Sequence, residues 1–157
     1  MPAGWASTDL EGAPDPTRPR LAAWTGTHLL VVNQNGQGGL FDVCANRWSR
    51  VSTEGVPPHL ALYGDRLNYP PVAAGNYVVF LYTGTYGSLS PFASTNAAVI
   101  YDIERNRWRV ADARGAPSPR ADAVVVGAGR EVIVWGGRSQ QPNGRGVVLG
   151  DGARLDP

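Results

Sequence analysis

Arginine side chains are the groups in this sequence whose type and spacing best suit binding chemistry. Three of them stand just before short apolar stretches at comparable points of a repeating pattern, and the fourth follows a pair of glycines; the four are Arg20, Arg66, Arg120 and Arg138. A guanidinium group presents a planar fork of N–H donors that fits a carboxylate or a phosphate. Converging arginines would therefore bind an acidic small molecule or an acidic protein segment. In the alternative interpretation each arginine pairs locally with an aspartate such as Asp65 or Asp122 and holds a loop.

Catalytic and metal chemistry have less support. His28 and His59 are far apart in the repeating pattern, and Cys44 is the single cysteine, which we expect to be buried and inert. Residues 151–156 faintly resemble a calcium loop, but Asp151 fits the repeat better. The chain has no Gly-x-Ser-x-Gly motif and no nucleophile next to a base. We therefore predict no metal, no cofactor and no catalytic residue, and we leave open whether the protein is an enzyme.

Length and composition favour an all-β chain that forms one domain or a piece of a larger one. Of the 157 residues, 20 are glycine and 13 are proline, and only 17% are charged, which favours short strands joined by turns over helices. The formal net charge of +1 gives no field that would attract nucleic acid, and no apolar run approaches the roughly 18 residues of a membrane span. We therefore predict neither nucleic acid nor a membrane as a partner. Residues 1–20 lack the apolar centre of a secretory signal, so we expect a cytoplasmic protein if Met1 is the native start and otherwise leave the compartment unknown.

The elements that position these side chains follow from a phrase that occurs twice. Residues 39–48 and 99–108 both run from apolar residues through an aromatic residue and an aspartate to a polar turn and the sequence Asn-Arg-Trp. The repeated structural positions are Asp42 and Trp48 in the first copy, and Tyr101, Asp102 and Trp108 in the second. In both copies the aspartate and the tryptophan are six residues apart. A duplication of this kind indicates an internal repeat.

The tail of the phrase occurs a third time near the N-terminus. Each tail is a tryptophan followed seven residues later by Gly-x-Pro; the pairs are Trp5 and Gly12, Trp48 and Gly55, and Trp108 and Gly115. Trp5 is therefore interpreted as the end of a further repeat unit.

Each unit is predicted to form four short strands, a to d in chain order. Strand b is an apolar run closed by glycine, at residues 29–32, 77–82 and 132–135. Strand c carries the aspartate of the phrase and strand d its tryptophan; in the third unit we place strand c at residues 147–151. The chain then divides into strand d of a preceding unit (1–10), a full unit (17–51), a full unit with insertions (66–111) and a unit without strand d (118–157).

These ordered elements resemble the kelch repeat in the form common in bacterial proteins, over nearly the whole chain. The residues that carry the resemblance are Pro19-Arg20, Trp24-Thr25-Gly26, Phe41-Asp42, Trp48, Tyr101-Asp102, Trp108, Gly115-Ala116-Pro117, Pro119-Arg120 and Trp135-Gly136-Gly137. The resemblance implies a β-propeller of six or seven four-stranded antiparallel blades, of which this chain would hold about three, an incomplete ring. Three positions depart from the family pattern: Asn35-Gly36, Thr83-Gly84 and Gly150-Asp151.

Ring closure is the question that this partial propeller raises. Propellers typically have 4–8 blades, so three blades are too few for a ring. The chain is then either a fragment of a longer propeller or a half-propeller. In the second case two copies pair as a homodimer of six blades, the Trp5 strand of each completing the last blade of the other. An unpaired edge at residues 147–151 favours such pairing, and a monomeric mass would contradict it.

Function follows from the resemblance only as an expectation. The connections that begin strand a and follow strand b lie on one face of a blade, so the four arginines would line one mouth of the ring. In kelch interaction domains, arginines at such positions bind acidic partners. We therefore predict a binding or scaffold module that recognises a protein or a small acidic ligand there. The alternatives are a carbohydrate-active propeller enzyme or part of one, similar to the epimerases and oxidases of this family, and a gene fragment without independent function. Residues 83–96 form either a recognition loop or a tolerated insertion.

Overall fold

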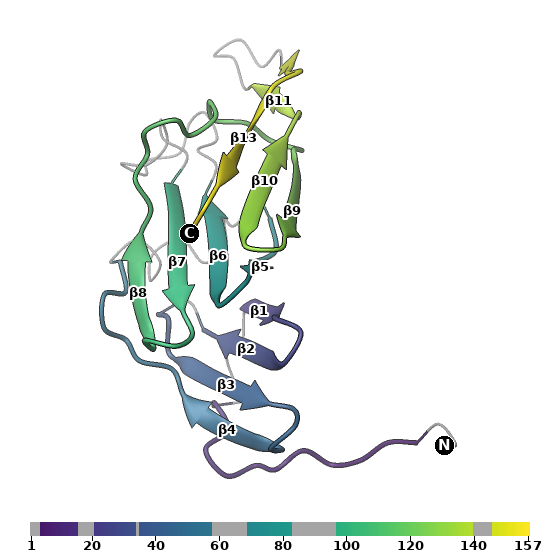
Figure 1. Ribbon diagram of the computed structural model, residues 1–157, viewed down its shortest axis with the longest axis vertical. Coiled ribbons are helices and arrows are strands. Elements are labelled where there is room, and N and C mark those ends of the chain that lie inside the picture. The colour runs from purple at the N-terminus through teal and green to yellow at the C-terminus, as the bar shows by residue number, and fades with distance from the viewer. Residues whose placement is uncertain (1–3, 16–20, 34, 58–68, 83–96, 140–145) are drawn as a thin grey trace.

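The fold consists of antiparallel β-sheets. The computed structural model describes residues 4–15, 21–33, 35–57, 69–82, 97–139 and 146–157. All regular structure in these residues is β, and the strands pair antiparallel (Figure 1). The prediction of an all-β chain is therefore confirmed. Within these ranges no helix is present that could cross a membrane.

Two sheets share one architecture, in which four consecutive strands lie side by side in chain order. The first sheet comprises β1 (Leu21–Trp24), β2 (His28–Val32), β3 (Gly38–Asp42) and β4 (Arg47–Arg50). The second comprises β5 (Val72–Ala74), β6 (Tyr77–Tyr82), β7 (Ala97–Asp102) and β8 (Arg107–Val110). The predicted four-stranded antiparallel units are confirmed for these two sheets. That the sheets are blades of an incomplete propeller ring stays a prediction.

A third sheet has three strands among the described residues, in the order β13-β10-β9. They are β9 (Val124–Ala128), β10 (Glu131–Trp135) and β13 (Gly152–Leu155). A short separate hairpin, β11 (Arg138–Ser139) with β12 (Val147–Val148), stands between β10 and β13 in the chain. Because β13 pairs with β10 alone, it forms one edge of this sheet.

The third unit corrects the predicted position of strand c. We placed that strand at residues 147–151, but the strand beside β10 is β13. Val132 pairs with Leu155 as Val78 pairs with Tyr101 in the second sheet. Leu155 and the following Asp156 therefore occupy the aromatic-Asp positions of the repeat. The prediction failed because the β11–β12 hairpin lengthens the connection, and because leucine replaces the aromatic residue.

The N-terminal segment differs from the strand predicted at residues 1–10. Residues 4–15 form no strand, and Trp5 is fully exposed. The segment runs past β4 at one end of the molecule, far from β13 (Figure 1). A strand d pairs with the strand c of its own unit, and no described strand pairs with this segment. We attribute its irregular conformation to that missing partner.

Two apolar cores lie between consecutive sheets. Side chains alternate along a strand, so β6 buries Val78 and Phe80 toward the first sheet and Val79 toward the third. The first core comprises Ala23, Leu30, Val32, Leu40, Val51, Val78, Phe80, Val99, Tyr101 and Trp108. The second comprises Ala74, Val79, Ala98, Ile100 and Val132. The middle sheet is therefore buried on both faces and fixes the positions of its two neighbours.

The repeated aspartate shapes the hairpin that precedes each tryptophan. Asp42 Oδ1 accepts the backbone N–H groups of Cys44 and Ala45 at 2.9 and 3.0 Å, and these bonds lower the pKa of its carboxyl group. Asp102 accepts the backbone N–H and the guanidinium of Arg105; burial opposes this effect, but the net result is again a lowered pKa. Cys44 lies exposed in its turn, so the expectation of a buried thiol is wrong, because the turn carries that residue to the surface.

Candidate functional site

The first two sheets meet at a joint built around Trp108. Its indole Nε1 donates to Ser52 O at 2.8 Å, and its backbone N–H donates to Glu54 O at 2.9 Å. Its ring packs on Phe80 and Tyr101, with centroid separations of 5.3 and 5.0 Å. Trp108 is therefore held by its own sheet on one side and, on the other, by the linker that follows β4.

Asn106 clamps the same linker through its side chain. Its Oδ1 accepts the Ser52 N–H at 2.7 Å, and its Nδ2 donates to Arg50 O at 3.1 Å. The Tyr101 hydroxyl also donates to Asn106 Oδ1, at 2.7 Å. Burial, reinforced by the charge of Asp102, raises the pKa of Tyr101 to about 12, which keeps this donor protonated. Asn106 has a left-handed φ of 48°, which asparagine tolerates better than most residues.

The same joint recurs at the N-terminal side of the first sheet. Trp48 Nε1 donates to Asp9 O at 3.0 Å, and the Asp9 N–H donates to Asn46 Oδ1 at 3.3 Å. Asn46 also has a φ of 48°. Asp9 therefore corresponds to Ser52, and each lies four residues after a tryptophan of the repeat, Trp5 or Trp48.

The linker adopts one shape in all three of its copies. In each copy a side-chain oxygen accepts a hydrogen bond from the backbone N–H two residues later. Asp9 accepts from Glu11, Ser52 accepts from Glu54, and Asp112 accepts from Arg114. A glycine follows with a φ of 74° or 75° at Gly12, Gly55 and Gly115. A Cβ added at Gly55 would lie 2.2 Å from Trp108 O, so glycine is needed for its conformation and for the close approach of the tryptophan strand.

The third linker borders an open pocket where the other two border a tryptophan. We call this pocket the socket. Its linker wall is formed by Ala111, Asp112, Arg114, Gly115, Ala116 and Pro117, and its sheet wall includes Val134, Ala153 and Leu155. By strand register, Val134 and Leu155 correspond to Phe80 and Tyr101, the residues that contact Trp108. The socket, with about 610 Å³ of atom-free space including its open mouth, therefore lies where the ring of a tryptophan on a strand beside β13 would be.

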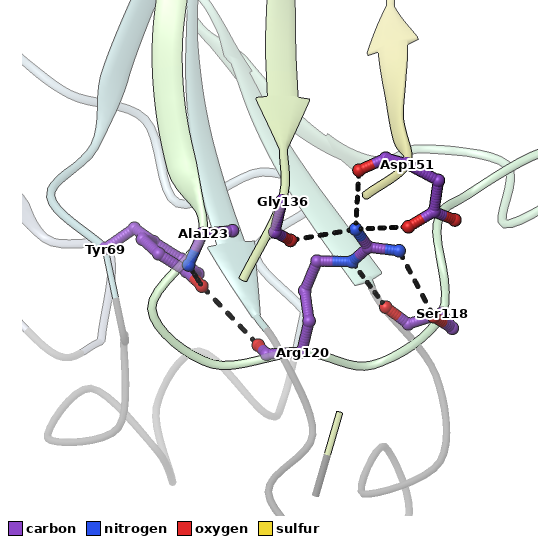
Figure 2. Close-up of polar contacts among 6 residues, drawn as sticks. All are labelled: Tyr69, Ser118, Arg120, Ala123, Gly136 and Asp151. Carbon is purple, nitrogen blue, oxygen red and sulfur yellow. Dashed lines mark hydrogen bonds and ion pairs between the residues drawn. The ribbon is translucent and has the colours of Figure 1, made fainter. Parts of the chain in front are cut away.

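Arg120 forms a network of hydrogen bonds with residues next to β10 and β13, the strands that supply the sheet wall of the socket (Figure 2). Its Nη1 donates to Gly136 O at 2.9 Å and to both Asp151 O and Asp151 Oδ1 at 3.0 Å. Its Nε and Nη2 donate to the carbonyl and hydroxyl oxygens of Ser118, and its side chain is 0% exposed. These bonds tie the end of β10 to the start of β13. The bond from Arg120 lowers the pKa of Asp151, although desolvation acts against it.

Tyr69 contacts both the segment that carries Arg120 and the socket. Its hydroxyl accepts the Ala123 N–H at 2.9 Å and lies 3.5 Å from Arg120 O (Figure 2). The Tyr69 side chain is buried and also lines the socket. The residues that precede β9 are thus held next to the empty ring position.

The four predicted arginines have different environments. Arg20 and Arg66 lie outside the described residues. Arg120 bonds internally, as the alternative interpretation expected, although its carboxylate partner is Asp151. Arg138 is exposed, and its backbone exchanges two hydrogen bonds with Ala121, the residue after Arg120. The shared arginine-lined mouth stays a prediction.

The two glycines predicted as structural lie at the end of β10. Gly136 and Gly137 have φ values of 68° and 93°. A Cβ on Gly137 would approach Ala121 O to 2.6 Å, so this close contact requires glycine.

The socket itself was not predicted from the sequence, although its signal is the predicted unit without strand d at residues 118–157. Gly115-Ala116-Pro117 repeats the linker motif, yet no tryptophan follows in the chain after Trp135.

In the described ranges no group of three or more His, Cys, Asp or Glu side chains could hold a metal. His28 Nδ1 forms a hydrogen bond with the Thr27 hydroxyl, and His28 Nε2 lies 3.8 Å from Asp42 Oδ2. These contacts fit a structural role for this histidine.

No protein-family model matches the chain, and no curated protein matches it at a significant level.

Proposed function

We propose that this chain is a protein-binding module built from kelch-type β-propeller blades. In this proposal its third blade accepts a β-strand of a protein partner at the free edge of β13, and a tryptophan of that strand enters the socket. The observation that carries the proposal is the likeness between the socket and the surroundings of Trp48 and Trp108. The linker has the same shape at all three places, and only the third lacks its ring.

The chemistry of the socket supports an indole as its occupant. The walls are mainly apolar, and the carbonyl of Asp112 corresponds to the Ser52 carbonyl that accepts the Trp108 N–H. Burying an aromatic side chain removes ~150–250 Å² from water, which gives an upper bound of about 4–6 kcal/mol at ~25 cal/mol per Å². The preformed linker reduces the ordering cost of binding, and β-strand addition to an edge contributes main-chain hydrogen bonds.

Recognition of an acidic group is a second proposal. Arg138 is the one predicted arginine whose side chain is exposed among the described residues, whereas the donors of Arg120 bond to Ser118, Gly136 and Asp151. An acidic segment of the same protein partner would contact Arg138 in strand β11 of the β11–β12 hairpin. The enzymatic alternative gains no support from the described side chains.

A synthetic peptide tests the proposed function. The probe is a fluorescently labelled copy of residues 105–112, which contains β8 and the Asn106 that precedes it. It is added to the Trp5→Ala chain, whose own N-terminal segment lacks an indole, and fluorescence anisotropy reports binding. We expect saturable binding that weakens at least about tenfold when alanine replaces the tryptophan in the peptide, since about 1.4 kcal/mol corresponds to that factor.

Two socket-filling variants serve as matched controls. Ala116→Phe on the linker and Ala153→Phe on the sheet wall should both abolish peptide binding, because each places a ring in the socket. Unchanged urea midpoints would show that the variants still fold. Equal binding of the tryptophan and alanine peptides would contradict the proposal.

A further inference from the structure

We propose that the strand that fills the socket is residues 4–10 of a second copy of this chain, with Trp5 as the inserted ring. This inference rests on the proposed function and names the partner for the same site. Two copies would exchange these segments reciprocally, so each copy completes the third sheet of the other.

The position of Trp5 in the repeat is the first observation. Trp5 precedes Asp9 by four residues and Gly12 by seven, and Trp108 stands in the same relation to Asp112 and Gly115. The linker that follows Trp5 is already in its place in the structure, because Trp48 and Asn46 clamp Asp9. The segment before it therefore has the sequence position of a tryptophan strand but lacks a sheet.

The exposure of this segment is the second observation. Trp5 is 105% exposed and Leu10 is 78% exposed. Burying a tryptophan is strongly favourable, so an indole left fully in water indicates a surface that meets a partner. Trp5 cannot fill the socket of its own chain in this arrangement, since the N-terminal segment runs past β4 beyond the first sheet, whereas β13 belongs to the third sheet (Figure 1).

Strand register defines the contacts of the exchanged segment. Trp48 pairs with Phe41 and Trp108 pairs with Tyr101. By the same register, Trp5 of the second copy would pair with Leu155, and its indole would donate to the carbonyl of Asp112. One clamp would be missing, because Ala3 stands where the other two copies have Asn46 and Asn106. We therefore expect this joint to be weaker than the joint inside the chain.

Two copies are the number that closes such an arrangement. Among the residues that the structure describes, each copy has one tryptophan segment that lies outside a sheet, residues 4–10, and one socket, and reciprocal exchange between two such copies joins six of the larger sheets. That number falls within the 4–8 blades of known propellers, whereas three copies would give nine. Reciprocal exchange also covers both β13 edges, and twofold pairs are the commonest symmetric assemblies.

Solution mass tests the exchange. Light scattering of the full chain at tens of micromolar should give twice the chain mass of 16.7 kDa, and Trp5→Ala and Ala116→Phe should each give monomers. Trp24→Ala is the matched control, because Trp24 is also exposed, at 52%, but lies in β1; this variant should stay dimeric. Mixing Trp5→Ala with Ala116→Phe should give a one-to-one heterodimer, since one intact segment and one open socket remain.

The outcomes separate this inference from the proposed function. A monomeric wild-type chain whose socket binds the 105–112 peptide would overturn the exchange and keep the strand-accepting function. A monomer that binds no peptide would overturn both. A dimer that survives Trp5→Ala, a larger assembly, or a failure of the two variants to form a heterodimer would each overturn the exchange alone.

Discussion

The buried side chain of Arg120 connects three segments around the third sheet. It is fully buried and bonds to Ser118, Gly136 and Asp151, which belong to three separate segments. The Asp151 carboxylate that faces it is 65% exposed, so the pair lies at the boundary of the core. The guanidinium donates hydrogen bonds to the carbonyl oxygens of these loops, which would otherwise have no donor from Arg120. The arginine therefore has a structural role that does not depend on a ligand.

Replacing Arg120 is expected to destabilise the chain strongly. Arg120→Ala leaves buried carbonyl acceptors without their donor, which costs about 3 kcal/mol, and the urea midpoint should fall accordingly. Arg138→Ala is the matched control, because that side chain is exposed; it should change stability by about 0.5 kcal/mol or less. Equal effects of the two substitutions would contradict the structural role of Arg120.

Stability is expected to fall in acid through the hydrogen-bonded aspartates. Asp42, Asp102, Asp112 and Asp151 all have pKa values below the ordinary 3.8. A carboxyl group whose pKa is lowered on folding stabilises the fold above its unfolded pKa. That contribution disappears as the pH falls through the folded pKa, here below about pH 4.

Asp151→Asn isolates one of these contributions. The hydrogen bond from Arg120 lowers the pKa of Asp151, so the variant should be less stable than the wild type at pH 7. The difference in urea midpoint should shrink between about pH 4 and pH 2, because protonation removes the same charge from the wild-type chain. A difference that is independent of pH would contradict this explanation.

Among the structural elements, the joint between sheets is the repeated unit of stability. The strand that carries the tryptophan belongs to one sheet, but the indole donates to the linker that follows the preceding sheet. The asparagine two residues before the tryptophan accepts from the same linker residue. Stability therefore depends on pairs of consecutive sheets, as in other repeat proteins whose units contact only their neighbours.

Trp108→Ala and Trp48→Ala should differ in cost. Trp108 is 3% exposed and packs between two sheets, so its loss should cost about 3–5 kcal/mol. Trp48 has a linker but no sheet on its outer side and is half-buried, so its loss should cost about half as much or less. Denaturant unfolding of both variants measures the difference, and equal losses would show that the second sheet adds little to the joint.

Local contacts explain which elements the sequence could predict. The hairpins at Asp42 and Asp102 were predictable because each carboxylate bonds to N–H groups within three residues. The partner of Arg120 was not, because Asp151 is 31 residues away and its place depends on the β11–β12 hairpin. The socket was hidden for a related reason, since it appears only when β13 replaces residues 147–151 as the strand beside β10.

At the scale of the whole molecule, the Trp5 segment and the socket match by their positions in the repeat but lie apart in space. The exposed Trp5 segment lies beyond the first sheet (Figure 1), and residues of the third sheet line the socket. The middle sheet is buried on both faces, so it acts as a rigid spacer that keeps them separated. The repeat pattern alone left open whether the chain is a fragment of a longer propeller or a half-propeller that pairs, whereas the pocket beside β13 required the structure.

The separation of Trp5 from the socket determines how many joints each copy could form with other copies. In the proposed exchange each copy offers one donor segment, residues 4–10, and one acceptor, the socket, so an open assembly has one fewer joint than it has copies. A closed assembly has as many joints as copies. The last joint forms within an existing complex, at the high effective concentration of a tethered pair, and it uses the one Trp5 segment and the one β13 edge that the open complex still exposes. A closed assembly would therefore stop adding copies because no free Trp5 segment or socket remains, and no separate blocking surface is needed.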